Sequence, residues 1–208
     1  MAIFLKKFET MSQYNAYTAD TENFILPNVS LITENNNVEY NPSTPPTPSF
    51  FCKLTNYRGE IDIVGSGELT EEMINNVVDE KIEIESAEIG TLCTSIGYMA
   101  FSYSNNLTSI TISDSVTTIG GSAFENCYSL TSVTIPSGVT TIGDNALGMC
   151  TGLTSITVEA VTPPTLSDYE QPFDTDNNCP IYVPSGSVNA YKAASGWSAY
   201  ASRIQAIP

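Results

Sequence analysis

The feature that most constrains this chain is an internal repeat with a period of 23 residues. The segment Leu-Thr-Ser-Ile-Thr-Ile at 107–112 recurs as Leu-Thr-Ser-Val-Thr-Ile at 130–135 and as Leu-Thr-Ser-Ile-Thr-Val at 153–158. A period of this length is typical of stacked repeats, in which each unit is one small structural element and contacts only its neighbours. The repeat therefore predicts an elongated stack rather than a single closed core.

Each unit contains a strand, a turn and a short buried segment. Leu-x-x-Ile-x-Ile places apolar residues on one face of a strand. The glycines at 97, 120 and 143 follow and are expected to supply a turn. An Ala-Phe or Ala-Leu pair then starts a short helical or 3₁₀ segment. We expect an earlier copy with its strand at 82–84 and about five extra residues after it, and a later copy at 181–186.

One unit cannot bury its own apolar face, so the units are expected to stack with equivalent side chains in columns. The predicted columns are Ile110/Val133/Ile156, Ile119/Ile142 and Phe101/Phe124/Leu147.

These motifs, Leu-Thr-Ser-Ile-Thr-Ile followed by Val-Thr-Thr-Ile-Gly, Ala-Phe and Cys, resemble the BspA-type leucine-rich repeats of bacterial surface proteins over residues 82–207. The tail segments 157–165 and 188–197 are similar to that family too. The resemblance implies a curved solenoid used for adhesion or protein binding, without catalytic residues. We therefore predict an α+β repeat fold. It is a right-handed leucine-rich repeat solenoid, rich in strands with short helical or 3₁₀ segments and capped at both ends.

We predict five parts along the chain. They are a small N-terminal attachment module at 1–40, a Pro-rich linker at 41–49, an N-terminal cap at 50–81, the solenoid at 82–186 and a C-terminal helical cap at 187–208. The first part resembles a leader found before varied repeat domains in gut bacteria and their phages, which implies attachment to a larger assembly. The alternative is a small subdomain or cap without such a role.

Two further elements are expected within the caps. In the N-terminal cap, strands are predicted at Phe50–Glu60 and Ile61–Val64, and a helix at Glu68–Val78 with Thr70 as its N-cap. In the C-terminal cap, apolar residues at helical spacing predict one amphipathic helix whose Trp197 covers the last coil; the alternative for Trp197 is an exposed ligand platform. The residues at helical spacing are Val188, Tyr191, Ala194, Trp197 and Tyr200.

Composition excludes several classes of function. The chain has 7 basic and 23 acidic residues, a net charge of −16 and no histidine. Nucleic acid and anionic membranes require clustered Lys and Arg, and histidine-dependent triads and metal sites require histidine. Acidic residues concentrate between Glu60 and Glu88, while residues 107–160 contain no Lys or Arg. The simplest interpretation is a solubilising surface, and the alternative is a docking surface for a basic partner.

Neither a membrane span nor a signal peptide is visible. No apolar run approaches the length of a span, and Lys6 and Lys7 follow the short apolar run Ala2–Leu5 instead of preceding it. The sequence therefore leaves the localisation open; the family resemblance suggests exposure on a cell surface or a virion.

The remaining candidates for chemistry are weak. The five cysteines are odd in number and lack a C-x-x-C pair, so buried free thiols are expected. Asp174–Asn178 begins like a calcium loop, but Cys179 and Ser185 stand where that loop needs Gly and Glu, so we expect an Asx-rich turn and no metal. No two carboxylates pair across a predicted pocket. We therefore predict no cofactor and no enzymatic activity.

The candidate binding surface is the outward face of the repeated strands. With the apolar residues of each strand inward, the alternating residues must face out and align on neighbouring coils as one continuous surface. These residues are Ser109, Thr111, Ser132, Thr134, Ser155 and Thr157, with Glu83, Glu85, Glu159 and Tyr182 extending the face. We predict that this face binds a protein or a glycan; the alternative is an ordinary polar strand surface.

The predicted function is non-catalytic binding or adhesion through this face. The alternative is a structural component of a phage or prophage-like particle, docked through residues 1–40. The sequence leaves the oligomeric state and the ligand open.

Overall fold

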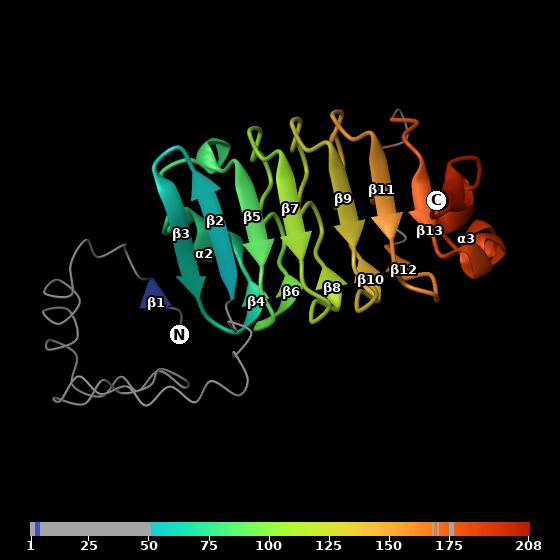
Figure 1. Ribbon diagram of the computed structural model, residues 1–208, viewed down its shortest axis with the longest axis horizontal. Coiled ribbons are helices and arrows are strands. Elements are labelled where there is room, and N and C mark those ends of the chain that lie inside the picture. The colour runs from blue at the N-terminus through green and yellow to red at the C-terminus, as the bar shows by residue number, and fades with distance from the viewer. Residues whose placement is uncertain (1–2, 5–50, 168, 170, 175–176) are drawn as a thin grey trace, which may run out of the picture. The chain divides into compact units, whose positions relative to one another are not determined.

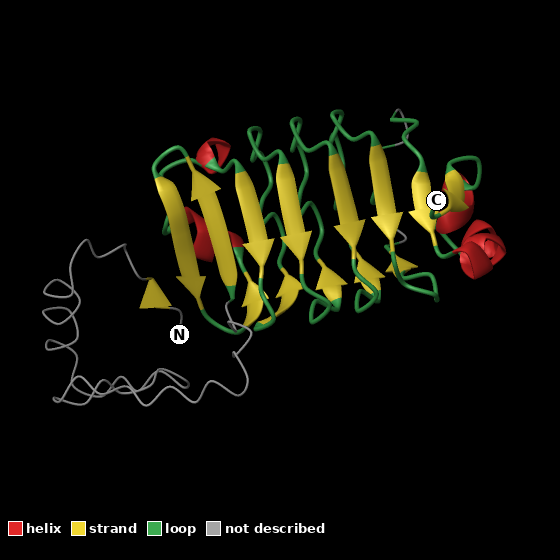
Figure 2. Cartoon of the chain, viewed as in Figure 1, coloured by secondary structure: helices red, strands yellow, loops and turns green. Residues whose placement is uncertain are grey.

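The computed structural model describes residues 3–4, 51–167, 169, 171–174 and 177–208. The predicted attachment module at 1–40 and the linker at 41–49 therefore lie outside the described residues, apart from the short strand β1 (Ile3–Phe4). The described region is rich in strands and has few, short helices, as predicted (Figures 1 and 2).

The strands form three sheets. The first sheet has the order β1-β3-β2-β5-β7, the second β12-β10-β8-β6-β4, and the third β14-β13-β11-β9. In Figure 2 the strands of the first and third sheets stand in one row, and the shorter strands of the second sheet lie behind them. The main row consists of β2 (Cys52–Asn56), β3 (Gly59–Val64), β5 (Ser86–Ile89), β7 (Ser109–Ile112), β9 (Ser132–Ile135), β11 (Ser155–Val158), β13 (Ile181–Val183) and β14 (Ile204–Ala206). The row behind it consists of β4 (Gly67–Leu69), β6 (Cys93–Ile96), β8 (Thr118–Ile119), β10 (Thr141–Ile142) and β12 (Thr165–Leu166).

Successive units pair in parallel at the repeat period. Ser86 is opposite Ser109 in β5 and β7, and Thr118 is opposite Thr141 in β8 and β10. Between β11 and β9 the partners are Ile156 and Val133. The 23-residue period read from the sequence is therefore the stacking register of the strands.

The first repeat differs from the prediction. Residues 82–84 were expected to be its strand, but Lys81–Glu83 form the 3₁₀ helix η1 and the strand is β5. Since β5 pairs with β7 at the regular spacing, the expected insertion of about five residues is wrong as well. The alternation Ile82-Glu83-Ile84 is typical of a strand. The strand in the structure has the small residue Ala87 at an inward position, so its apolar pattern is weak in the sequence.

The N-terminal elements follow the prediction in part. β2 and β3 form an antiparallel hairpin, and β2 also pairs with β5. The predicted helix at Glu68–Val78 is shorter in the structure, where α2 covers only Glu71–Asn75. Its expected first residues belong to a strand instead, since Leu69 of β4 pairs with Ile96 of β6. The predicted N-cap is confirmed, since the Thr70 hydroxyl accepts a hydrogen bond from the Met73 N–H at 3.3 Å.

The C-terminal helix is also split. The helix α3 (Val188–Ala193) follows η2 (Ser185–Ser187), and a left-handed Gly196 with φ 74° separates it from η3 (Trp197–Tyr200). The Trp197 side chain is fully buried, and its indole N–H donates to the Pro164 carbonyl at 2.7 Å. It therefore contributes to the core and is not an exposed ligand platform.

The predicted columns Phe101/Phe124/Leu147 and Ile119/Ile142 are confirmed, and the third column is confirmed only for Val133 and Ile156. Phe101 and Phe124 are both buried, with their rings stacked at a centroid distance of 5.4 Å and an interplanar angle of 12°. Leu147 is buried as the third member of that column. Ile110 is only partly buried, whereas its equivalents Val133 and Ile156 are buried.

The segments after the repeated glycines are turns, not the expected helical or 3₁₀ segments. Two positions in each turn have left-handed backbone, at Met99/Ser122/Asn145 and at Tyr103/Asn126/Met149. The glycines that precede them are needed for a different reason than the one expected. Gly120 does not have a positive φ, but a Cβ there would lie 2.7 Å from the carbonyl carbon of Gly97 in the preceding coil. Glycine therefore permits the backbones of successive units to approach closely.

The main row of strands is interrupted between β7 and β9. Within the part of the chain that the structure describes, no ladder joins these two strands, although β5 pairs with β7 and β9 with β11. Pro136 follows β9 and has no N–H. At the equivalent positions the N–H groups of Ser113 and Glu159 donate to the preceding coil at 3.1 and 2.9 Å. The proline thus removes one bond from this β7/β9 junction.

Candidate binding surface on the strand face

The six predicted site residues lie where the strand alternation puts them. Ser109, Thr111, Ser132 and Thr134 are exposed, and Ser155 and Thr157 are half-buried. The alternation follows from the period-2 geometry of a strand, in which burying one face exposes the other. The predicted strand phase is therefore correct for all three units.

The hydroxyls of these six residues differ from those of neighbouring repeat threonines in their hydrogen bonding. Four other repeat threonines donate their hydroxyls to a carbonyl of the preceding coil, at 2.9–3.2 Å. These are Thr108, Thr117, Thr140 and Thr154. The six site hydroxyls make no hydrogen bond to any described residue. They are consequently available as donors and acceptors for a partner.

The face extends farther toward the N-terminus than the sequence indicated, and through other residues. In β5, Ser86 stands opposite Ser109 of β7, and Glu88 stands opposite Thr111. On its other side, β5 pairs with β2, where Ser86 stands opposite Thr55 and Glu88 opposite Lys53. Ser86 and Glu88 were missed because the first strand was assigned to the wrong residues. The signal that could have located them is the spacing of 23 residues back from Ser109.

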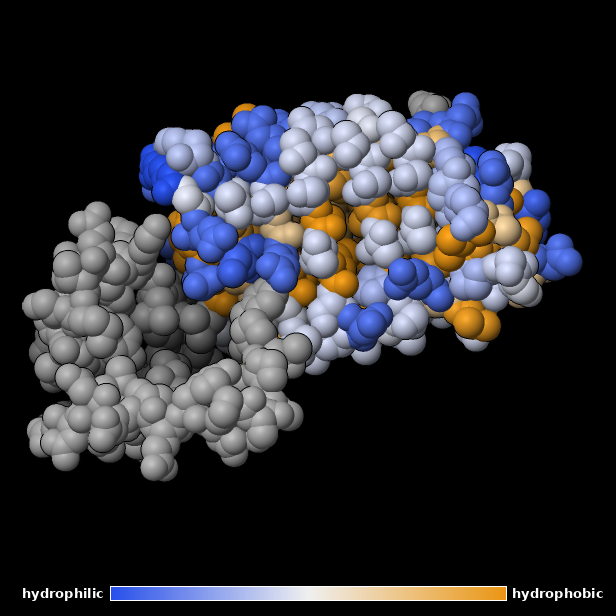
Figure 3. Space-filling view, in the orientation of Figure 1, coloured by the Kyte–Doolittle hydropathy of each residue, from blue (hydrophilic) through white to orange (hydrophobic). Residues whose placement is uncertain are grey.

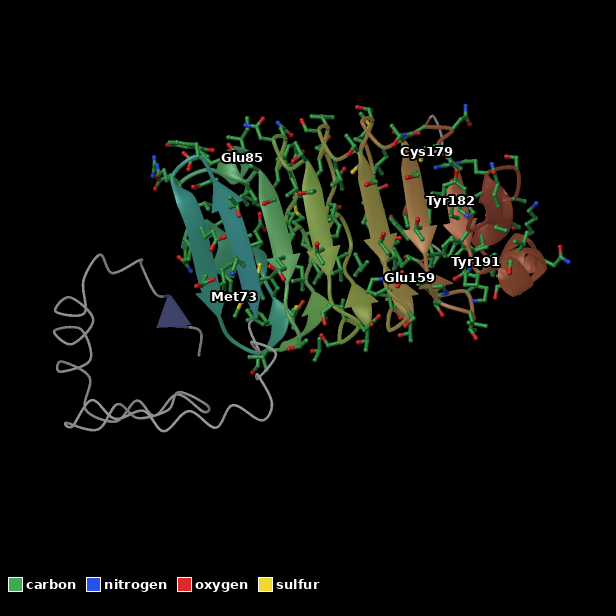
Figure 4. The ribbon with its side chains drawn as sticks, viewed as in Figure 1. Met73, Glu85, Glu159, Cys179, Tyr182 and Tyr191 are labelled. Carbon is green, nitrogen blue, oxygen red and sulfur yellow. The ribbon has the colours of Figure 1, made fainter. Side chains whose placement is uncertain are left out.

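Of the four residues expected to extend the strand face, only Tyr182 stands opposite one of the six site residues. Tyr182 of β13 is opposite Thr157, and it is half-buried. Glu85 precedes β5 and Glu159 follows β11, so both lie beyond the strand ends, as Figure 4 shows. Glu83 lies in η1 and approaches the Arg58 guanidinium at 3.8 Å.

The β7/β9 junction divides the surface into two parts. Ser109 and Thr111 belong to the first sheet, and the other four residues belong to the third sheet, where Ser132 pairs with Ser155 and Thr134 with Thr157. The hydrogen-bonded ladder beneath the predicted hydroxyl surface is therefore interrupted at this point, although β7 and β9 remain neighbours. A regular rung spacing of about 4.8 Å holds within each sheet.

The charge of the face changes along its length. Over β2, β3 and β5 it carries Lys53, Glu60 and Glu88, and strongly hydrophilic residues gather there in Figure 3. A pocket of about 230 Å³ lies among these residues and is also lined by Ser109 and Thr111. From β7 to β11 the outward strand positions are uncharged.

In the predicted Asx-rich segment Asp174–Asn178, the side chain of Asn177 serves the fold. The Asn177 side-chain amide donates to the carbonyls of Cys150 and Leu153, and its oxygen accepts the Cys179 N–H at 2.9 Å. Asp176 lies outside the described residues. In the described ranges, no group of three His, Cys, Asp or Glu side chains is placed to hold a metal ion.

All five cysteines are buried free thiols, as predicted. Burial raises the pKa of Cys52 well above its ordinary range and that of Cys93 to about 11. The pKa of Cys127 is also raised, first by its hydrogen bond with Cys150 and then by burial. Because the thiolate is the reactive form, these thiols are poor nucleophiles.

No helix among the described residues is long and apolar enough to cross a membrane.

Comparison with known proteins agrees with the repeat. Residues 72–169 match the BspA type leucine rich repeat region, in 6 copies. None of the curated proteins compared with the chain matches it. The matched residues include β5 to β11, which pair at the repeat register. The repeats within residues 72–169 are therefore similar to those of the BspA-type leucine-rich repeat family.

Proposed function

We propose that the chain is a non-catalytic recognition protein that binds a protein or a glycan through the strand face. Leucine-rich repeats of this type indicate an interaction or adhesion role. The observation that carries the proposal is the set of six outward hydroxyls that make no hydrogen bond to the described part of the chain, on strands whose other face is buried. The nearby repeat threonines use their hydroxyls to join coils, so the two groups have different roles.

The proposal includes the form of the scaffold. We infer a right-handed solenoid in which β2, β3 and α2 cover the first coil and α3 with η3 covers the last. The parallel register between successive units supports the solenoid, and the buried Tyr191, Trp197 and Tyr200 support the C-terminal cap. A rigid scaffold of this kind would hold the face for a partner at little ordering cost.

The test is a triple variant, Thr111→Lys/Thr134→Lys/Thr157→Lys. Each change adds a bulky charge at an outward position, so the fold should be nearly unaffected, with changes of about 0.5 kcal/mol or less per site. Binding of the partner that the wild-type chain captures should be abolished, as measured by surface plasmon resonance.

The matched control is Ser137→Lys/Thr162→Lys/Ser185→Lys, which adds the same charge at exposed positions outside the strands. This control should bind like wild type. Full-strength binding by the folded strand-face variant would refute the proposal. The alternative role as a particle component depends on residues 1–40, which lie outside the described residues apart from Ile3–Phe4, so it stays a prediction.

A further inference from the structure

A second surface of the repeats has features that the strand face lacks. The connections that lead from β6 to β7, from β8 to β9 and from β10 to β11 carry four large exposed side chains, Tyr98, Tyr103, Tyr128 and Met149. Tyr103 is 55% exposed, Tyr128 42% and Met149 50%. We call the row formed by Tyr103, Asn126, Tyr128 and Met149 the turn edge; these connections lie at the top of Figure 1.

The backbone brings these residues together. Tyr103, Asn126 and Met149 hold the same place in successive units, 23 residues apart. The Tyr103 N–H donates to the Glu125 carbonyl at 2.8 Å, and the Asn126 N–H donates to the Gly148 carbonyl at 2.9 Å. The Tyr128 hydroxyl donates to the Asn126 Oδ1 at 2.7 Å, so its ring joins the same row.

The conformation of this row is unfavourable for the residues that occupy it. The φ angles are 63° at Tyr103 and 56° at Met149, in the left-handed region that tyrosine and methionine rarely adopt. Asn126 holds the same conformation with φ 62°, and asparagine tolerates it far better. Two of three units therefore keep a strained, large and exposed side chain where asparagine would fit, and strain of this kind persists at functional sites.

The charge of the surrounding chain indicates what the edge would bind. No Lys or Arg occurs between Lys81 and Lys192. Elsewhere, two tyrosine rings are already covered by a cation, with Arg58 over Tyr57 at 5.1 Å and Arg203 over Tyr200 at 5.5 Å. The surface above β7 and β9 in Figure 3 is pale, without a strongly hydrophilic cluster.

We propose that the turn edge is a docking surface for a cationic protein segment, whose Arg or Lys side chains stack on Tyr103 and Tyr128 beside Met149. A ring face attracts a cation through its quadrupole, and the acidic chain favours the approach of a basic partner. This surface is separate from the strand face and does not depend on the function proposed for it.

The test uses the full-length chain and a fluorescent oligo-arginine peptide, with affinity measured by anisotropy. The variant is Tyr103→Asn/Met149→Asn, which leaves the net charge unchanged and matches Asn126. We expect its urea midpoint to rise, because strain is relieved, while its affinity for the peptide falls about tenfold. A residue with a purely structural role would lower stability instead.

A matched control separates the turn edge from other exposed rings. Tyr57→Ser removes an exposed ring outside the turn edge and should bind like wild type. Unchanged affinity in the Asn variant would show that the peptide responds only to net charge and would overturn the proposal. A lower urea midpoint in that variant would overturn it too, since it would show that packing holds Tyr103 and Met149 in place.

Discussion

At the residue scale, inward and outward positions of one unit should differ sharply in their contribution to stability. Phe124 is buried and stacks on Phe101, so Phe124→Ala removes buried surface and leaves a cavity. We expect it to lower the free energy of unfolding by about 3–5 kcal/mol. Thr134→Ala changes an exposed side chain and should cost about 0.5 kcal/mol or less. Urea denaturation of the two variants measures the difference, and equal midpoints would mean that the strand phase is wrong.

The glycines of the repeat allow a second residue-scale prediction. A Cβ at Gly120 would meet the backbone of Gly97 and Tyr98 at 2.7–2.9 Å, and backbone cannot move aside as a side chain would. Gly120→Ala should therefore destabilise the fold by about 1–3 kcal/mol or more. Gly186→Ala is the control, since nothing lies within 4 Å of its added Cβ. Equal melting temperatures for the two variants would contradict the close stacking of coils.

Which residues face inward could be predicted because the strand period and the repeat period act together. Ser109 and Thr111 were placed on the outside by alternation alone. The left-handed positions at Tyr103 and Met149 could not be predicted, since neither residue is typical of that conformation. Only the alignment of these two positions with Asn126 indicates a left-handed backbone there.

At the scale of elements, the β7/β9 junction should be the least protected part of the main row. The N–H groups of Thr108 and Thr154 donate to the preceding coil at 2.9 and 2.8 Å. Thr131 holds the equivalent position, and its N–H makes no such bond within the described part of the chain. We expect its amide to exchange with deuterium at least about tenfold faster than that of Thr154. Equal protection in NMR exchange experiments would show that the two sheets are continuous.

The regular repeats were predictable as elements, whereas the irregular ends were less so. β7, β9 and β11 repeat one motif, and each unit supports the assignment of the others. At the N-terminus a single unit with Ala87 at an inward position gave too little signal, and the strand was placed at residues 82–84. At the C-terminus, helical spacing over 188–200 suggested one helix, but Gly196 breaks it. Pairing with β7 decided the first case, and the left-handed backbone at Gly196 decided the second.

At the scale of the whole molecule, the buried thiols predict a loss of stability in alkali. The pKa of Cys93 is raised from 9.0 to about 11, and burial raises that of Cys52 as well. Above about pH 9 the unfolded chain releases these protons while the folded chain keeps them. The free energy of unfolding should therefore fall as the pH rises from about 9 to 11, by up to about 1.4 kcal/mol per pH unit for each thiol.

Urea titrations at a series of pH values measure this slope. Cys93→Ala removes one of the titrating thiols, so the slope of the variant should be smaller than that of wild type. A slope that is the same with and without the thiol would contradict the assignment.

The central claim is that recognition resides in the repeats and not in residues 1–48. The most direct measurement compares the full-length chain with a fragment of residues 49–208 for binding of the captured partner. Surface plasmon resonance gives the affinity, and circular dichroism verifies that the fragment folds. The account predicts equal dissociation constants for both, and loss of that binding in the strand-face lysine variant. A folded fragment that no longer binds, beside a lysine variant that still does, would contradict it.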